Sequence, residues 1–173
     1  MYIKMIGCTF LMISTTAIGL LKSEQLKKRV LYLNELKRMM GLLQGELRFH
    51  RATLSEAAQN VAKRVEDPFS IFLNGLADKL ENRCLEGFTY VWNKMSEELL
   101  AYGGLQKEDK SLLEQLGRSL GYLDLEMQTE SLNLAIIQTE EAIQSAKEQK
   151  EIKGKLYRTM GVTAGAFLTL LII

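Results

Sequence analysis

Long apolar runs lie at both ends of the chain, and the charged residues lie between them. Residues 5–21 contain no charged side chain, and neither do residues 159–173. Between these runs, apolar residues recur at steps of three and four, which is the spacing of one helix face. No segment alternates apolar and polar residues for long enough to predict a strand. The pattern predicts an all-α protein, with a bundle of about six helices whose first and last helices continue into the terminal runs.

The first central helix is expected to run without a break from the N-terminal apolar run to about Phe49. Its apolar positions follow one stripe: Leu26, Val30, Leu33, Leu36, Met40, Leu43 and Leu47. The later helices carry similar stripes, which include Val61, Phe72, Trp92, Met95, Leu116, Leu125 and Leu132. Helices bury such stripes against their neighbours, so these residues are the expected core.

Local signals mark the ends of the shorter helices. Thr53-Leu54-Ser55-Glu56 is a capping box, in which the threonine hydroxyl and the glutamate each satisfy a backbone N–H. Asp67-Pro68 predicts another helix start, with aspartate as the N-cap and proline at the first helical position. Gly103-Gly104 and Gly121 predict helix ends. Asp124 is expected to cap the last helix.

The terminal apolar runs predict two membrane spans. A helix over residues 5–21 covers roughly 25 Å, which is close to the roughly 30 Å of a bilayer core. Flanking lysines can extend that reach. The predicted division is an N-terminal span over residues 1–22, a central helical domain over 23–155 and a C-terminal span over 156–173. A cleaved signal peptide is the competing interpretation of the N-terminus, although no good cleavage site follows Leu11.

Basic residues indicate the orientation of the two predicted spans. They follow the first span and precede the second, at Lys22, Lys27, Lys28, Arg29, Lys147, Lys150, Lys153, Lys155 and Arg158. Only Lys4 lies on the far side. By the positive-inside rule, the central domain is expected in the cytoplasm, with both short ends pointing outward. Gly161 and Gly165 form a G-x-x-x-G in the second span, which either packs against another membrane helix or occurs by chance.

Composition and motifs do not favour catalysis or nucleic-acid binding. The 22 basic residues nearly balance the 21 acidic ones, whereas nucleic-acid binding needs a basic excess. The single histidine, His50, is placed between Arg48 and Arg51, so we expect it in solvent at the helix end and not at a metal site. No phosphate-binding loop is present. We therefore expect no enzyme activity, no cofactor and no bound metal. Cys8 and Cys84 are expected to be free thiols.

Several stretches of the sequence together resemble one family. They are Gly45-Glu46-Leu47-Arg48-Phe49 with Thr53-Leu54-Ser55-Glu56-Ala57, Asp67-Pro68, Leu116-Gly117-Arg118-Ser119-Leu120-Gly121-Tyr122-Leu123-Asp124 with Gln128, and the tail from Lys155 to Ile173. Over nearly its whole length, the chain resembles the stage III sporulation protein AB family of endospore-forming bacteria. Leu54 departs from the proline expected there in the family, but Thr53 can still cap the helix.

The resemblance implies a role without catalysis in a secretion-like complex between the mother cell and the developing forespore. The family is similar to the inner-membrane platform proteins of type II secretion and type IV pilus systems, which sit over a secretion ATPase. The implied partners are a cytoplasmic secretion ATPase, other membrane subunits of the complex and the membrane, but no nucleic acid. The implied location is the mother-cell side of the cell membrane. A membrane-anchored helical sensor or scaffold outside any secretion system is the alternative.

Polar residues within the family stretches are the candidate contacts with the ATPase. They are Glu46, Glu56, Arg118, Asp124 and Gln128. The competing interpretation is that these side chains cap helices and form hydrogen bonds within the fold, as most buried or helix-end polar groups do.

Overall fold

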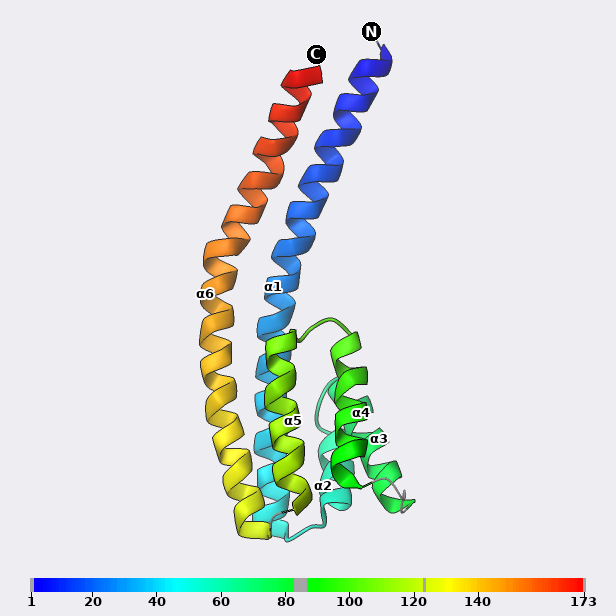
Figure 1. Ribbon diagram of the computed structural model, residues 1–173, viewed down its shortest axis with the longest axis vertical. Helices are drawn as coiled ribbons and strands as arrows, with labels where there is room; N and C mark the ends of the chain where they lie inside the picture. The colour runs from blue at the N-terminus through cyan, green and yellow to red at the C-terminus, as the bar shows by residue number, and fades with distance from the viewer. Residues whose placement is uncertain (1, 83–86, 123, 173) are drawn as a thin grey trace. The chain divides into compact units, whose positions relative to one another are not determined.

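The computed structural model describes residues 2–82, 87–122 and 124–172, apart from the side chains of residues 2–12, 122, 158, 161, 162, 164–166 and 168–172. The helices are α1 (Tyr2–His50), α2 (Leu54–Ala62), α3 (Phe69–Glu81), α4 (Phe88–Ala101), α5 (Lys107–Tyr122) and α6 (Leu125–Ile172). The described residues thus form six helices and no strand (Figure 1). The predicted all-α class is confirmed.

The chain forms two compact units, and the boundaries between them fall inside α1 and α6. Unit 1 comprises Met1–Val30 and Gln144–Ile173, and unit 2 comprises Leu31–Ile143. The predicted domain limits at residues 22 and 155 concern the edge of a membrane. The division into compact units does not test them, so they stay a prediction.

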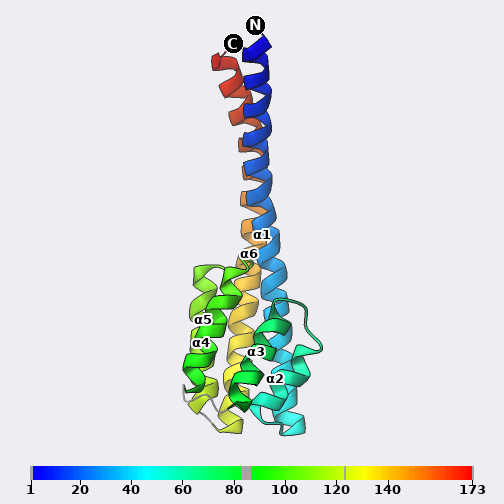
Figure 2. The same ribbon diagram turned by 90° about the vertical axis from the view of Figure 1, so that its right-hand side faces the viewer.

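Unit 2 is a helical bundle whose shorter helices pack in chain order. The helix α2 packs against α3, α3 against α4, and α4 against α5, as Figures 1 and 2 show from two sides. Edge-to-face aromatic pairs join these helices to each other and to α1. Tyr32 of α1 meets Phe69 of α3 with ring centroids 5.7 Å apart, and Phe72 of α3 meets Trp92 of α4 at 5.1 Å.

The predicted apolar stripes are largely confirmed. Every residue of the α1 stripe, from Leu26 to Leu47, is buried. Leu125 is the exception among the later helices, because it is 40% exposed and was expected in the core. It is the first residue of α6 and lines an open hollow. Its side chain is therefore exposed because it lies before the part of α6 that packs against other helices.

The start of α2 is confirmed and the start of α3 is displaced. At α2, the Glu56 N–H donates to Thr53 Oγ1 and the Thr53 N–H donates to Glu56 Oε2. The predicted N-cap role of Asp67 is wrong, because α3 begins at Phe69 with Pro68 as its N-cap. The backbone carbonyl of Glu66 accepts from the N–H groups of Phe69 and Ser70, at 3.0 and 3.2 Å. A turn of backbone thus supplies the acceptor expected from the aspartate.

The two glycine signals have different outcomes. The helix α4 ends at Ala101, and Gly103 adopts the left-handed φ of +72° that suits glycine after a helix. Gly121 was expected to end α5, but the helix continues to Tyr122. A Cβ on Gly121 would lie 2.9 Å from Cδ1 of Phe88. This glycine therefore permits close packing of α5 on α4 and does not end the helix.

Unit 1 contains the first part of α1 and the last part of α6, which lie side by side in both views (Figures 1 and 2). Ser23 and Gly154 are buried at their contact, where a Cβ on Gly154 would lie 3.4 Å from Ser23 Oγ. Small residues let the two helices approach closely. Unit 1 also exposes large apolar side chains: Ile13, Ile18, Leu20, Leu21, Ile152, Leu156, Met160 and Phe167.

Within the part of the chain that the structure describes, no helix offers a stretch long and apolar enough to cross a membrane. Many side chains of the predicted spans lie outside the described residues, and both spans stay a prediction. The backbone of Gly161 and Gly165 is part of α6, but their predicted packing against another helix lies outside what is described. The same holds for the thiol of Cys8 and for Cys84.

Candidate partner-binding surface

Glu46 of α1 is buried and forms hydrogen bonds within unit 2. Its carboxylate accepts from Asn60 Nδ2 at 3.2 Å and from Arg64 Nη1 at 3.4 Å. His50 Nδ1 lies 3.3 Å from the same carboxylate, although the His50 side chain is 69% exposed, as predicted. A buried carboxylate needs such donors, since an unpaired buried charge is costly. Glu46 therefore ties the end of α1 to α2 and the residues that follow it.

Glu56 is exposed, and its hydrogen bonds complete the capping box of α2. The Thr53 backbone N–H donates to its carboxylate at 2.8 Å, and the Thr53 hydroxyl lies 2.9 Å from the same oxygen. These two hydrogen bonds, the backbone one first, lower the pKa of Glu56 from its ordinary value of 4.5. The charged form of Glu56 thus stabilises the start of α2.

Asp124 and Gln128 join the end of α5 to the start of α6. The Met127 N–H donates to Asp124 Oδ1 at 2.9 Å, so Asp124 caps α6 as predicted. Gln128 Nε2 donates to the Leu120 carbonyl at 2.8 Å, which satisfies an acceptor in the last turn of α5. Both side chains do what the competing interpretation of the family residues expects. Contact of these residues with a partner stays a prediction.

Arg118 differs from the other four candidates. It is exposed on α5, and no hydrogen bond or ion pair joins its side chain to another described residue. Its guanidinium is thus available to a partner, and its predicted role as a contact is untested.

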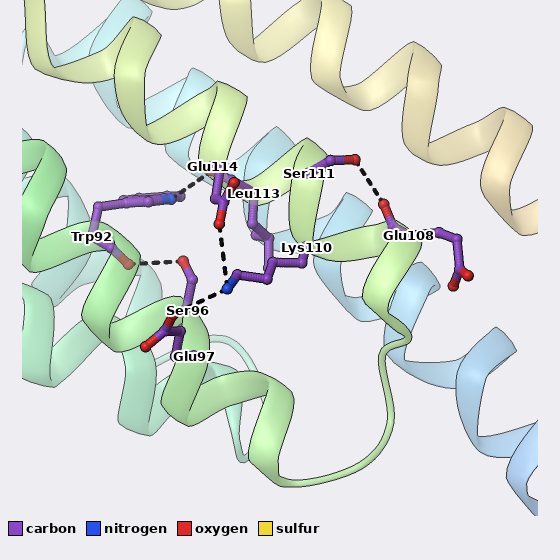
Figure 3. Close-up of polar contacts among 8 residues, drawn as sticks. All are labelled: Trp92, Ser96, Glu97, Glu108, Lys110, Ser111, Leu113 and Glu114. Atoms are coloured by element: carbon purple, nitrogen blue, oxygen red, sulfur yellow. Dashed lines mark hydrogen bonds and ion pairs between the residues drawn. The ribbon is translucent and has the colours of Figure 1, made fainter.

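The glycines of the Leu116–Asp124 stretch have a structural role at the contact of α4 with α5. A Cβ on Gly117 would lie only 2.2 Å from Cδ1 of Trp92. Figure 3 shows the Trp92 indole directed at α5, where Nε1 donates to the Leu113 carbonyl at 2.7 Å. The Ser96 hydroxyl in turn donates to the Trp92 carbonyl at 2.8 Å. This family stretch therefore includes a helix-packing motif.

An exposed ion pair lies at the rim of the same contact (Figure 3). Lys110 Nζ of α5 lies 3.0 Å from Glu97 Oε1 of α4 and 3.5 Å from Glu114 Oε1. The hydrogen bond to Glu97, followed by its charge, raises the pKa of Lys110 above 10.5. Exposed pairs of this kind add little stability, so the buried tryptophan is the main element of this contact.

An open hollow of about 610 Å³ lies between the end of α1 and the start of α6. Its lining residues are Gln44, Arg48, Arg51, Leu125, Glu126, Thr129, Glu130 and Asn133. Gln44 Nε2 donates to the Thr129 carbonyl at 3.0 Å and so joins its two walls. Figure 1 shows the two helix ends side by side at the bottom of the view. The other lining side chains include two arginines, two carboxylates and the Asn133 amide, which can contact a ligand.

Phe49 contacts Arg48, which lines the hollow, and was not among the predicted contact residues. It is 77% exposed, and the Arg48 guanidinium carbon lies 5.7 Å from the centre of its ring. The sequence carried a signal for this exposure, because Phe49 falls off the stripe that ends at Leu47. The hollow itself joins residues about 80 positions apart, and nothing in the sequence predicted it.

Within the described residues, no group of three or more histidine, cysteine, aspartate or glutamate side chains is arranged to hold a metal ion. The described polar groups instead cap helices, join helices to one another or line the hollow. What this arrangement can do chemically is to bind another molecule through charge and apolar contact.

Comparisons with known proteins agree on one family. The family model described as "Stage III sporulation protein AB" matches residues 4–173. A curated relative, stage III sporulation protein AB of Bacillus subtilis (strain 168), is 24% identical over 171 residues, which is 99% of each chain. A solved structure of stage III sporulation protein AB matches with a TM-score of 0.66 and 22% identity, over 72% of this chain and 98% of that one. This likeness supports the fold.

The match of the family model extends over nearly the whole chain and includes all the stretches that suggested the resemblance. The matches are to sporulation proteins and not to a known enzyme family. The chain therefore belongs to the stage III sporulation protein AB family.

Proposed function

We propose that this chain is a platform subunit, without catalytic activity, of a secretion-like complex between the mother cell and the forespore. In this role it docks a cytoplasmic secretion ATPase and links that ATPase to the other membrane subunits. Membership of the stage III sporulation protein AB family is the observation that carries the proposal.

The use of polar groups in unit 2 supports a scaffolding role. Glu46 joins α1 to the α2 region, and Gln128 joins α5 to α6. The indole of Trp92 is buried and bonded to α5. Groups committed to such contacts make a rigid body, and a rigid body is what a platform needs in order to hold a partner in place.

Membrane attachment is part of the proposal and is supported by the surface of unit 1. Large apolar side chains such as Ile13, Leu21 and Phe167 are each more than 60% exposed there. A run of such residues on paired helices needs an apolar environment. The basic residues that flank the predicted spans support a cytoplasmic position of the central domain, by the positive-inside rule. Reporter fusions at each end and within unit 2 test this orientation.

Co-purification from sporulating cells tests the proposed function. The full-length chain with an affinity tag is recovered with mild detergent, and its partners are identified by mass. We expect the secretion ATPase and other membrane subunits of the complex. Recovery of membrane subunits without the ATPase contradicts the proposed docking role, and recovery of neither favours a sensor or scaffold outside any secretion system.

An insertion after Lys22 tests whether unbroken helix is needed at this point of α1. Four glycines break the helix, whereas four alanines add the same number of residues and preserve it. We expect the glycine variant to sporulate poorly at normal protein level and the alanine variant to sporulate better. Equal sporulation of wild type and the glycine variant contradicts a need for unbroken helix at this point.

A further inference from the structure

The last three residues of α1 and the residue that follows them place charge and aromatic surface together. We define the α1 tip as Arg48, Phe49, His50 and Arg51. Phe49 is largely exposed, and the Arg48 guanidinium carbon lies 5.7 Å from its ring centre. A cation stacked on an exposed ring offers an apolar face and a positive charge at one place. Aromatic residues and arginine are also enriched at the energetic centres of protein interfaces.

The α1 tip contributes to the lining of the hollow, and no ion pair joins the described basic and acidic side chains that line it. Arg48 and Arg51 line one wall, and Glu126 and Glu130 line the other. Among the described residues, none of these four side chains has a hydrogen bond or an ion pair with another residue. The hollow therefore presents two cations and two carboxylates, on separate walls, to any molecule that enters it.

Arg51 has a backbone conformation that costs free energy for arginine and would not do so for glycine. Its φ is +49°, in the left-handed region where an L side chain costs free energy and glycine does not. This conformation turns the chain out of α1, and the Ala52 N–H then donates to the Glu46 carbonyl at 3.4 Å. The chain thus holds an arginine where glycine would end the helix better, and that arginine lines the hollow.

We propose that the α1 tip and the hollow form the docking surface for a protein segment that carries an acidic residue beside a basic one. The acidic residue binds Arg48 and Arg51, and the basic residue faces Glu126 and Glu130. An apolar residue of the same segment covers Phe49. Identification of this segment as part of the cytoplasmic ATPase rests on the proposed function.

A photo-crosslinking amino acid placed at Phe49 of the full-length chain, in sporulating cells, tests the location of this surface. Tyr90 on α4 is the matched control, because it is also an aromatic residue with a 54% exposed side chain. We expect crosslinks from position 49 to the ATPase and none from position 90. Crosslinks from position 49 to lipid alone, or equal yields of ATPase crosslink from both positions, overturn the proposal.

Charge variants test the chemistry of the same surface. In the double variant Arg48→Glu, Arg51→Glu we expect at least about tenfold less ATPase recovered, because each charge-assisted contact is worth about one factor of ten. The variant Arg51→Gly removes the side chain and suits the backbone. It should unfold at the same or a higher temperature than wild type while recovering less ATPase, so its defect cannot be ascribed to misfolding.

Lys94→Glu separates failure of the docking surface from failure of the proposed function. It reverses an exposed lysine on α4, away from the lining of the hollow, and should leave ATPase recovery within twofold of wild type. If wild type recovers the ATPase and the α1 tip variants do so equally, the docking surface is wrong and the platform role stands. If wild type recovers no ATPase, the platform role and the assigned partner are both wrong.

Discussion

Replacing Gly117 by alanine should destabilise unit 2, although alanine favours helices over glycine. The new Cβ would lie 2.2 Å from Cδ1 and 2.7 Å from Nε1 of Trp92, whereas carbon atoms in good contact are about 3.5–4.0 Å apart. The indole has little room to move. It is fully buried, donates to the Leu113 carbonyl at 2.7 Å, and meets the Phe72 ring edge to face.

The magnitude follows from three terms. Inserting a methyl into a packed core costs about 1–3 kcal/mol. Displacing the indole from its buried hydrogen bond costs about 1–3 kcal/mol. The better helix propensity of alanine offsets about 1 kcal/mol. The net loss is about 3 kcal/mol, which lowers the unfolding temperature of a chain of this size by roughly 6–12 °C.

Thermal unfolding of the purified full-length chain, followed by circular dichroism, measures this loss. Gly41→Ala is the matched control, because Gly41 is an exposed residue inside α1 with nothing within 4 Å of an added Cβ. It should gain about 1 kcal/mol. In a double variant with Trp92→Leu, the cost of Gly117→Ala should largely disappear. A Gly117→Ala protein that unfolds at or above the wild-type temperature refutes the close contact.

Three further predictions concern helix ends. Because its folded pKa is lowered from 4.5, Glu56 stabilises the protein at pH values above 4.5, and this contribution disappears as the pH falls through the folded pKa. The stability difference from Glu56→Gln should thus be present at pH 7 and absent in acid, and a constant difference in urea titrations contradicts this. Asp124→Ala should lose about 1 kcal/mol in urea unfolding and Asp124→Asn much less; equal losses would show that charge, not capping, matters. Arg51→Gly should gain about 0.5–1 kcal/mol, and a lower unfolding temperature contradicts the assigned strain.

The helices of unit 2 could be predicted from sequence because their signals are local. The α1 stripe repeats the helical period over six turns, so the buried face was defined without knowledge of its neighbours. The capping box at Thr53 and the cap at Asp124 depend on residues within three positions of each other. Such short-range signals do not depend on how the helices later pack.

The errors arose where helix packing or a competing backbone acceptor decides the outcome. Gly121 has the local character of a helix end, but packing against Phe88 gives it a place inside α5. At Pro68, the Glu66 carbonyl displaces Asp67 as the acceptor for the first turn of α3. Leu125 matches a core stripe, but it lies at the first position of α6 beside an open hollow. None of these arrangements can be read from residue spacing alone.

The candidate contacts were chosen as polar residues in family stretches, and the structure suggests a different criterion. Glu46, Asp124 and Gln128 each satisfy a partner within the fold, so their presence is explained without a second protein. A docking residue is better sought where a side chain lowers the stability of the fold or makes no contact within it. The aromatic ring of Phe49 is exposed to solvent. Arg51 has a strained backbone, with a positive φ, and its side chain lines the hollow. Because a glycine at position 51 relieves that strain, stability and partner binding should change in opposite directions there, which a purely structural residue cannot produce.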